Sequence, residues 1–147
     1  MVFLGADHRG YELKEKIKKY LDEKEVAYKD YGTNSSELVN YPIIAKEVCL
    51  NMNVREDKAI LICGSGIGMS MAANKFKGIR AGICLNEEAA RDGKQHSNLN
   101  VLVLAGDVMS YEESVKIIDI WLESEFLNGR YLERIKMIEE IEKENMK

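Results

Sequence analysis

Short apolar segments alternate with amphipathic helical segments along almost the whole chain, and no other feature of the sequence constrains the fold as strongly. The pattern predicts strands at 2–6, 26–31, 58–63, 80–85 and 101–105. It predicts helices at 10–23, 41–53, 67–76, 87–94, 111–124 and 131–144. The third and fifth strands are continuous apolar runs, as in parallel sheets that are covered on both faces. The alternation therefore predicts the α/β class: a Rossmann-like three-layer α/β/α sandwich with a five-stranded parallel sheet.

Local signals mark the faces and the ends of these helices. The first predicted helix places three apolar side chains on one face: Leu13, Ile17 and Leu21. Asn40 is a candidate N-cap, and Pro42 falls in the first turn, where its missing N–H costs little. Ser110 and Glu113 have the spacing of a capping box.

Length and composition narrow the class of protein. The 147 residues predict one domain, and 46% hydrophobic with 31% charged residues is typical of a water-soluble protein. The apolar runs are too short to cross a bilayer, and residues 1–6 predict a strand rather than a signal peptide. We therefore expect a cytoplasmic protein with no membrane partner. A net charge of −4 makes nucleic acid an unsuitable partner.

The chain has three cysteines, Cys49, Cys63 and Cys84, and none of them forms a CxxC motif. An odd number without that spacing argues against a disulfide framework and against a zinc site. At least one free thiol is expected, and its position in the fold decides whether its role is functional or structural.

The turn after the third predicted strand carries the most informative motif, Cys-Gly-Ser-Gly-Ile-Gly at 63–68. Its alternating glycines let the backbone approach a ligand, and the following helix begins with free N–H groups that favour an anion. A thiol beside such a helix start can have its pKa lowered, and Cys63 occupies that place in this motif. Met69 stands where a dinucleotide-binding turn needs its last glycine, and the P-loop lysine is missing. The alternative is a tight turn with Cys63 as a buried strand end.

Other polar residues permit a functional and a structural interpretation. Asp7 follows the first predicted strand and can bind a ligand or cap the next helix. His8 and His96 are the only histidines, and a single histidine is more often structural. Arg130 and Arg134 are four residues apart, so they share a helix face and can grip a phosphate or pair with nearby glutamates.

Together these motifs resemble the type B ribose-5-phosphate isomerases, in the wider group that includes galactose-6-phosphate isomerase. The resemblance covers essentially the whole chain and rests on five segments: GADHRGY, GTNSSELVNYP, ILICGSGIGMSMAANKFKGIRAGIC, KQHSNLNVLVL and NGRYLERI. It implies an aldose–ketose isomerase that converts ribose 5-phosphate to ribulose 5-phosphate through an enediol. It implies neither a metal nor an organic cofactor.

The resemblance also implies catalytic roles. Cys63 would move a proton between the first two sugar carbons, and His96 would help to open the furanose ring. Ser65 would line the hole for the enediolate oxygen. Backbone N–H groups of the same turn would complete that hole, which involves Gly64, Gly66 and Gly68.

Further residues would bind the substrate. Asp7 would hold a sugar hydroxyl, Tyr41 would border the site, and Ser97 stands where the family commonly has asparagine after the histidine. Three basic side chains would bind the phosphate: His8, Arg130 and Arg134.

The chain departs from the family pattern at several positions. Asp107 replaces a common arginine after the fifth strand and would repel a phosphate. Asn40 and Tyr131 replace an aspartate and a histidine. These changes leave open a six-carbon substrate, allose 6-phosphate or galactose 6-phosphate, and a sugar-phosphate binding protein without turnover. A dinucleotide-binding redox domain is the weakest alternative.

The predicted topology also suggests that two subunits share the site. Cys63, Asp7 and His8 follow strands, so they lie at the carboxyl edge of a parallel sheet. His96 precedes the fifth strand, after a helix that runs back across the sheet, unless Asp92 and Gly93 end that helix early. Because a proton-transfer partner must lie within about 3 Å of its target, we expect a homodimer, or a tetramer built from such dimers, with the helix from about 131 at an interface.

Overall fold

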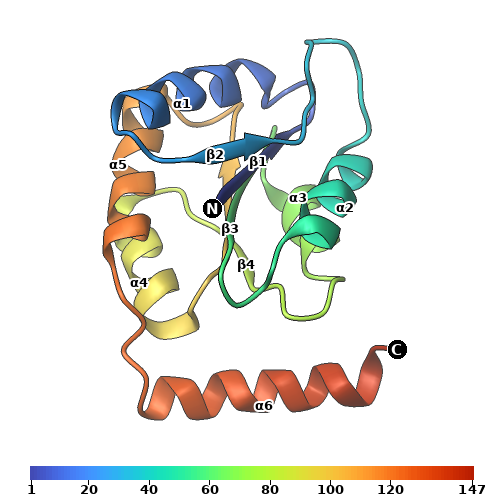
Figure 1. Cartoon of the computed structure of the whole chain (residues 1–147), viewed down its shortest axis with the longest axis vertical. Coiled ribbons are helices and arrows are strands. Elements are labelled where there is room, and N and C mark those ends of the chain that lie inside the picture. Colours follow the sequence, from blue (N-terminus) through green and yellow to red (C-terminus); the bar gives the residue numbers. More distant parts are fainter.

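A computed structural model describes all residues, 1–147 (Figure 1). Its core is a parallel sheet in the order β2-β1-β3-β5-β4. The strands are β1 (Val2–Ala6), β2 (Tyr28–Asp30), β3 (Lys58–Cys63), β4 (Ala81–Ile83) and β5 (Val101–Ala105). The predicted α/β fold with a five-stranded parallel sheet is confirmed.

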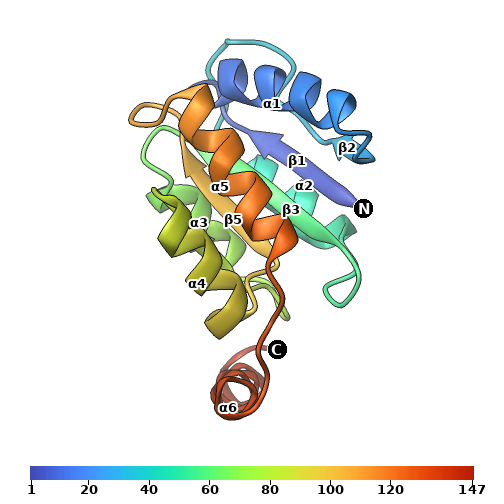
Figure 2. The same cartoon turned by 90° about the vertical axis from the view of Figure 1, so that its left-hand side faces the viewer.

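Six helices accompany the sheet: α1 (Tyr11–Glu23), α2 (Tyr41–Asn51), α3 (Ile67–Ala73), α4 (Glu87–Ser97), α5 (Tyr111–Glu123) and α6 (Arg130–Asn145). Helices α1, α4 and α5 cover one face, and α2 and α3 cover the other (Figure 2). A separate apolar cluster fills the space on each face. The central strands β1, β3 and β5 are buried along their whole apolar length, as their continuous apolar runs predicted.

The strand order reverses direction between β1 and β3, which pair with each other from Val2 and Lys58 onward. In open parallel sheets, ligands bind outside the carboxyl ends of the strands at such a reversal. The turns that follow β1, β3 and β5 therefore meet at one edge of the sheet, and this edge contains the Cys63 turn.

The predicted bounds need correction at the two edge strands and at two helices. Strands β2 and β4 have three residues each, shorter than predicted, because each pairs with a neighbour on one side only. Helix α3 ends at Ala73 instead of residue 76. Helix α4 continues to Ser97 instead of ending at residue 94.

Gly93 explains why α4 does not stop early. A Cβ atom at Gly93 would lie 2.6 Å from Leu99 Cδ1, so glycine permits close packing here rather than ending the helix. The helix ends at Ser97 and is capped by Asn98, which adopts the left-handed conformation (φ 48°) and donates its N–H to the Lys94 carbonyl.

The predicted helix starts were correct in part. The capping box of Ser110 and Glu113 is present, with both hydrogen bonds formed. Asn40 occupies the N-cap position of α2, and Pro42 lies in its first turn, but the Asn40 side chain makes no capping hydrogen bond. No helix of the structure is long and apolar enough to span a membrane.

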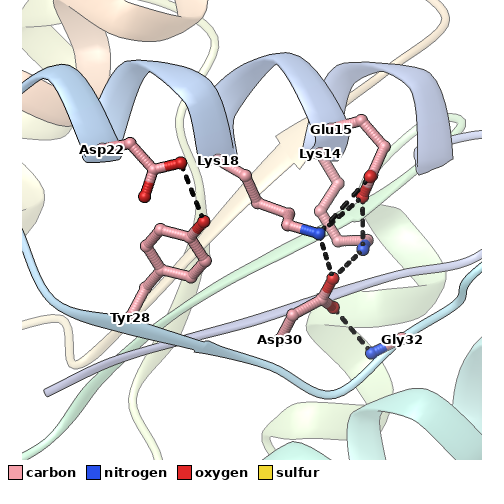
Figure 3. Close-up of polar contacts among 7 residues, drawn as sticks. All are labelled: Lys14, Glu15, Lys18, Asp22, Tyr28, Asp30 and Gly32. Carbon is pink, nitrogen blue, oxygen red and sulfur yellow. Dashed lines mark hydrogen bonds and ion pairs between the residues drawn. The ribbon is translucent and has the colours of Figure 1, made fainter.

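A charged network joins α1 to β2, and the sequence pattern did not indicate it (Figure 3). Lys14 is fully buried, and its Nζ atom lies 2.6 Å from Asp30 Oδ2 and 3.0 Å from Glu15 Oε2. Lys18 contributes a second ammonium 2.9 Å from the same Asp30 oxygen. Asp30 Oδ1 accepts the Gly32 N–H at 2.8 Å, so the network anchors the chain that leads from β2 toward the carboxyl edge.

Candidate active site

Cys63 is the last residue of β3, and its side chain is buried at the start of the glycine turn. Gly66 adopts φ +82°, a conformation that favours glycine, and its N–H donates to Cys63 Sγ at 3.2 Å. A backbone N–H directed at sulfur stabilises the thiolate more than the thiol. Ser65 is exposed, and its Oγ accepts the Ile67 N–H at 3.2 Å. A thiol, a hydroxyl and backbone donors therefore meet at this turn.

The turn after β5 fixes the orientation of the peptides that follow Cys63. Gly106 N–H donates to the Cys63 carbonyl at 2.7 Å, and Asp107 N–H donates to the Gly64 carbonyl at 3.1 Å. In a trans peptide the C=O and N–H groups point in opposite directions. The N–H groups of Gly64 and Ser65 are therefore directed away from the β5 turn, as donors to an oxyanion would have to be.

Tyr41, the first residue of α2, borders the same turn on the face of the sheet that α2 and α3 cover. A Cβ atom at Gly68 would lie 2.5 Å from the Tyr41 ring. Gly68 is therefore the position that allows the phenol ring to lie against the start of α3. Gly66 needs glycine for its positive φ, whereas Gly64 and Gly68 need it because a side chain there would collide with a neighbour.

Asp7 and His8 lie in the turn after β1. Asp7 is 5% exposed, and its Oδ1 accepts the N–H groups of Arg9 at 3.0 Å and Gly10 at 3.1 Å. One carboxylate oxygen thus accepts backbone hydrogen bonds just before α1, while Oδ2 makes no hydrogen bond within the chain. His8 Nδ1 lies 3.2 Å from the Val39 carbonyl oxygen and 3.3 Å from its N–H, so the β2–α2 loop holds the ring.

Arg9 is a site residue that sequence reasoning missed. Its guanidinium forms an ion pair with Asp107, and both side chains lie against Gly64. The repulsive carboxylate expected at position 107 is therefore paired. The available signal was an arginine in the β1 turn, but only the fold brings positions 9 and 107 together.

A second group of predicted site residues surrounds Tyr131. The rings of His96 and Tyr131 stack with centroids 4.5 Å apart. The guanidinium carbons of Arg130 and Arg134 lie 5.0 Å and 5.8 Å from the Tyr131 centroid. Positive φ angles at Asn128 and Gly129 turn the chain into α6 and place Arg130 at its first position. Ser97, exposed at the end of α4, lines a groove beside α6.

These two groups lie at opposite edges of the sheet in one chain. The Cys63 turn follows the carboxyl end of β3, whereas α4 runs back to end near α6, beyond the amino ends of the strands (Figures 1 and 2). The structure thus brings Cys63, Ser65, Asp7 and Tyr41 together and does not bring His96, Arg130 or Arg134 to them within one subunit. No three His, Cys, Asp or Glu side chains are placed to hold a metal ion.

Comparison with known proteins identifies the family. Residues 2–138 match the Ribose/Galactose Isomerase family. The chain is 42% identical to ribose-5-phosphate isomerase B of Escherichia coli over 142 residues, which is 96% of this chain and 95% of that protein. It is 35% identical to the ribose-5-P isomerase B of Listeria innocua, covering 98% of both.

Solved structures agree with this result. The ribose-5-phosphate isomerase B of Clostridium thermocellum superposes with a TM-score of 0.94 at 40% identity, covering 97% of both chains. That of Mycoplasma genitalium, solved with bound ribulose-5-phosphate, gives a TM-score of 0.90 at 38% identity, covering 98% of this chain and 97% of that one. The chain belongs to the ribose/galactose isomerase family.

Proposed function

We propose that this protein interconverts ribose 5-phosphate and ribulose 5-phosphate through an enediol, with Cys63 as the base. The observation that carries the proposal is the Gly66 N–H directed at Cys63 Sγ at the carboxyl edge of the sheet. Two further facts support the substrate. Relatives covering nearly the whole chain are ribose-5-phosphate isomerases, and the Mycoplasma genitalium relative binds ribulose-5-phosphate.

The proposed proton transfer uses groups that meet at this turn. The Cys63 thiolate takes the proton from C2 of the open-chain aldose, and the electron pair moves to the carbonyl oxygen at C1 to give an enediolate. The Ser65 hydroxyl and the N–H groups of Gly64 and Ser65 stabilise the negative oxygen. The proton of the C2 hydroxyl passes to the C1 oxygen, the C2 oxygen becomes the ketone carbonyl, and the thiol returns its proton to C1. The reaction is redox-neutral overall and consumes no co-reactant.

We further propose that a second subunit completes the site. His96 would assist ring opening, and Arg130 and Arg134 would bind the phosphate together with His8 of the first subunit. The wide separation of the two groups in one chain supports this proposal. Helix α6 also exposes three apolar side chains, consistent with a subunit interface: Met137, Ile138 and Ile141. A two-fold dimer would build two such sites, and a tetramer would contain two dimers.

Ketose formation from three aldose phosphates tests this function. Ribose 5-phosphate should be the best substrate, ahead of allose 6-phosphate and galactose 6-phosphate. Cys63→Ala should abolish turnover and still bind the substrate. Cys84→Ala is the matched control, because burial raises the pKa of the Cys84 thiol to about 11 and leaves it protonated. Near-normal turnover by Cys63→Ala would exclude Cys63 as the base.

A further inference from the structure

An ion pair crosses over the catalytic turn. The Arg9 guanidinium extends from the turn after β1, and the Asp107 carboxylate extends from the turn after β5. A Cβ atom at Gly64 would lie 2.6 Å from Arg9 Cζ and 2.7 Å from Asp107 Oδ2. Both charged groups therefore rest on the residue directly after Cys63, and any side chain at position 64 would displace them.

The backbone around the pair holds both partners in register with this turn. Asp7 accepts a hydrogen bond from the Arg9 N–H at 3.0 Å, which fixes the backbone from which the Arg9 side chain extends. Asp107 donates its own N–H to the Gly64 carbonyl at 3.1 Å, which fixes the carboxylate relative to the turn. A Cβ atom at Gly106 would lie 2.8 Å from the Arg9 carbonyl oxygen, so the turns after β1 and β5 are in direct backbone contact.

The charge of Asp107 creates an electrostatic problem at this position. The turn has to favour a thiolate and a developing enediolate, and a lone carboxylate beside Gly64 would oppose both anions. The Arg9 guanidinium cancels that charge. The Arg9 and Asp107 side chains are 58% and 37% exposed, so the pair itself adds little to folding stability. Its main consequence is the electrostatic potential at the turn.

We propose that Arg9 and Asp107 form one positioning pair for the isomerisation, in which Asp107 holds the Arg9 guanidinium against Gly64 and Arg9 cancels the carboxylate field at the catalytic turn. The pair contacts the turn and not the reacting atoms. Turnover therefore depends on Arg9, because this chain carries an aspartate at position 107. This inference rests on the proposed role of Cys63.

Four variants test the pair: Arg9→Ala, Arg9→Lys, Asp107→Asn and Arg9→Ala/Asp107→Asn. Arg9→Ala leaves the carboxylate unpaired, so kcat for ribose 5-phosphate should fall about tenfold. A tenfold change corresponds to a shift of about one pKa unit in a catalytic group. The KM should change less than threefold, and the acid limb of the kcat profile should move to higher pH. Arg9→Lys should restore most of kcat, and the double variant should regain most of what Arg9→Ala loses.

A measurement without turnover separates this inference from the proposed function. The rate of Cys63 alkylation by iodoacetamide, followed by mass spectrometry of its peptide, should shift to higher pH in Arg9→Ala and return in the double variant. If Cys63→Ala retains turnover, the proposed base is wrong, whereas the alkylation profile still reports on the pair.

Two results would overturn the proposal that Arg9 and Asp107 form a positioning pair. One is a double variant no better than Arg9→Ala with an unchanged alkylation profile, which would indicate a packing role. The other is a loss that appears in KM for ribose 5-phosphate alone, which would place Arg9 on the phosphate.

Discussion

The imidazole ring of His96 stacks on the phenol ring of Tyr131, with 4.5 Å between the centroids and 9° between the planes. Tyr131 also lies beneath the guanidinium groups of Arg130 and Arg134, and its hydroxyl accepts a hydrogen bond from Arg130 Nη2 at 3.0 Å. One aromatic side chain therefore organises three residues that were predicted separately from the sequence.

Replacement of Tyr131 should disturb all three neighbours. An aromatic stack of this kind contributes about 0.5–1.5 kcal/mol beyond burial, so Tyr131→Ala should lower kcat/KM about three- to tenfold. Tyr131→Phe keeps the ring and should lose much less. Steady-state kinetics with ribose 5-phosphate measures both variants, and equal losses would mean that the hydroxyl, and not the ring, is what matters.

A site shared between subunits predicts complementation. Cys63→Ala and His96→Ala should each be inactive as homodimers. Mixed under subunit exchange, they should form heterodimers in which one of the two sites has both Cys63 and His96. Activity should rise toward a quarter of the wild-type level at an equal mixture, since half of the dimers are mixed. Absence of recovery, with exchange proved by native mass spectrometry, would place both residues in one subunit's site.

Arg134 should act on the phosphate. A hydrogen bond to a charged group contributes about 1.5–3 kcal/mol, so Arg134→Ala should raise the KM for ribose 5-phosphate about tenfold or more. Turnover of free ribose, which lacks the phosphate, should not change by the same factor. Arg91→Ala, an exposed arginine on α4, is the matched control. Equal effects on both substrates would show that Arg134 does not bind the phosphate.

Lys94 should make the stability of the protein depend on pH above neutrality. Burial, and then the adjacent Lys58 charge, lower the pKa of Lys94 to about 8. An unfolded lysine titrates near 10.4, so the unfolded state binds more protons between about pH 8 and 10.4, and this group makes stability rise with pH there. Lys94→Met removes the buried ammonium. The free energy of unfolding of this variant should therefore exceed that of wild type by about 1–3 kcal/mol at pH 7, and the excess should shrink by pH 10.

Urea unfolding at pH 7, 8.5 and 10 measures this effect. Both proteins keep Cys49 and Cys84, whose pKa values burial raises to about 12 and about 11, so their contribution cancels in the difference. A difference between the two proteins that stays constant with pH would show that Lys94 does not titrate in this range.

The Lys14 network should contribute to stability unequally through its two lysines (Figure 3). Lys14 is fully buried, whereas the Lys18 side chain is 26% exposed. Lys14→Met leaves Lys18 as the only cationic partner of Asp30, whose side chain is 15% exposed, so the free energy of unfolding should fall by about 2 kcal/mol or more. Lys18→Met should cost less than about 1 kcal/mol. Equal losses measured by urea unfolding would contradict the burial argument.

The same network predicts a loss of stability in acid. Burial by itself would raise the pKa of Asp30, but hydrogen bonds from Lys14, Lys18 and the Gly32 N–H outweigh it and lower the pKa below its ordinary value. The stabilisation is therefore complete above about pH 4, where the unfolded aspartate is ionised, and is lost as the pH falls through the lower folded value. Asp30→Asn should lack this acid-dependent step.

Periodicity determined much of this fold before any tertiary contact was known. The bounds of β1, β3 and β5 were predicted without error, because strands buried on both faces are continuous apolar runs. The capping box at Ser110 was equally local, since its two hydrogen bonds join residues three apart. The edge strands and the end of α4 were less predictable, because pairing on one side and the packing of Gly93 against Leu99 are long-range effects.

The candidate site divides in the same way. The motif around Cys63 and the arginine spacing of α6 are local, so the sequence by itself determined the family and the list of candidate residues. Which of them meet was decided by the tertiary structure alone. The course of α4 carries His96 away from Cys63 to Tyr131, and the sheet brings Arg9 to Asp107, 98 residues apart in the chain. Strand order sets such distances through contacts between remote segments, and no local pattern encodes them.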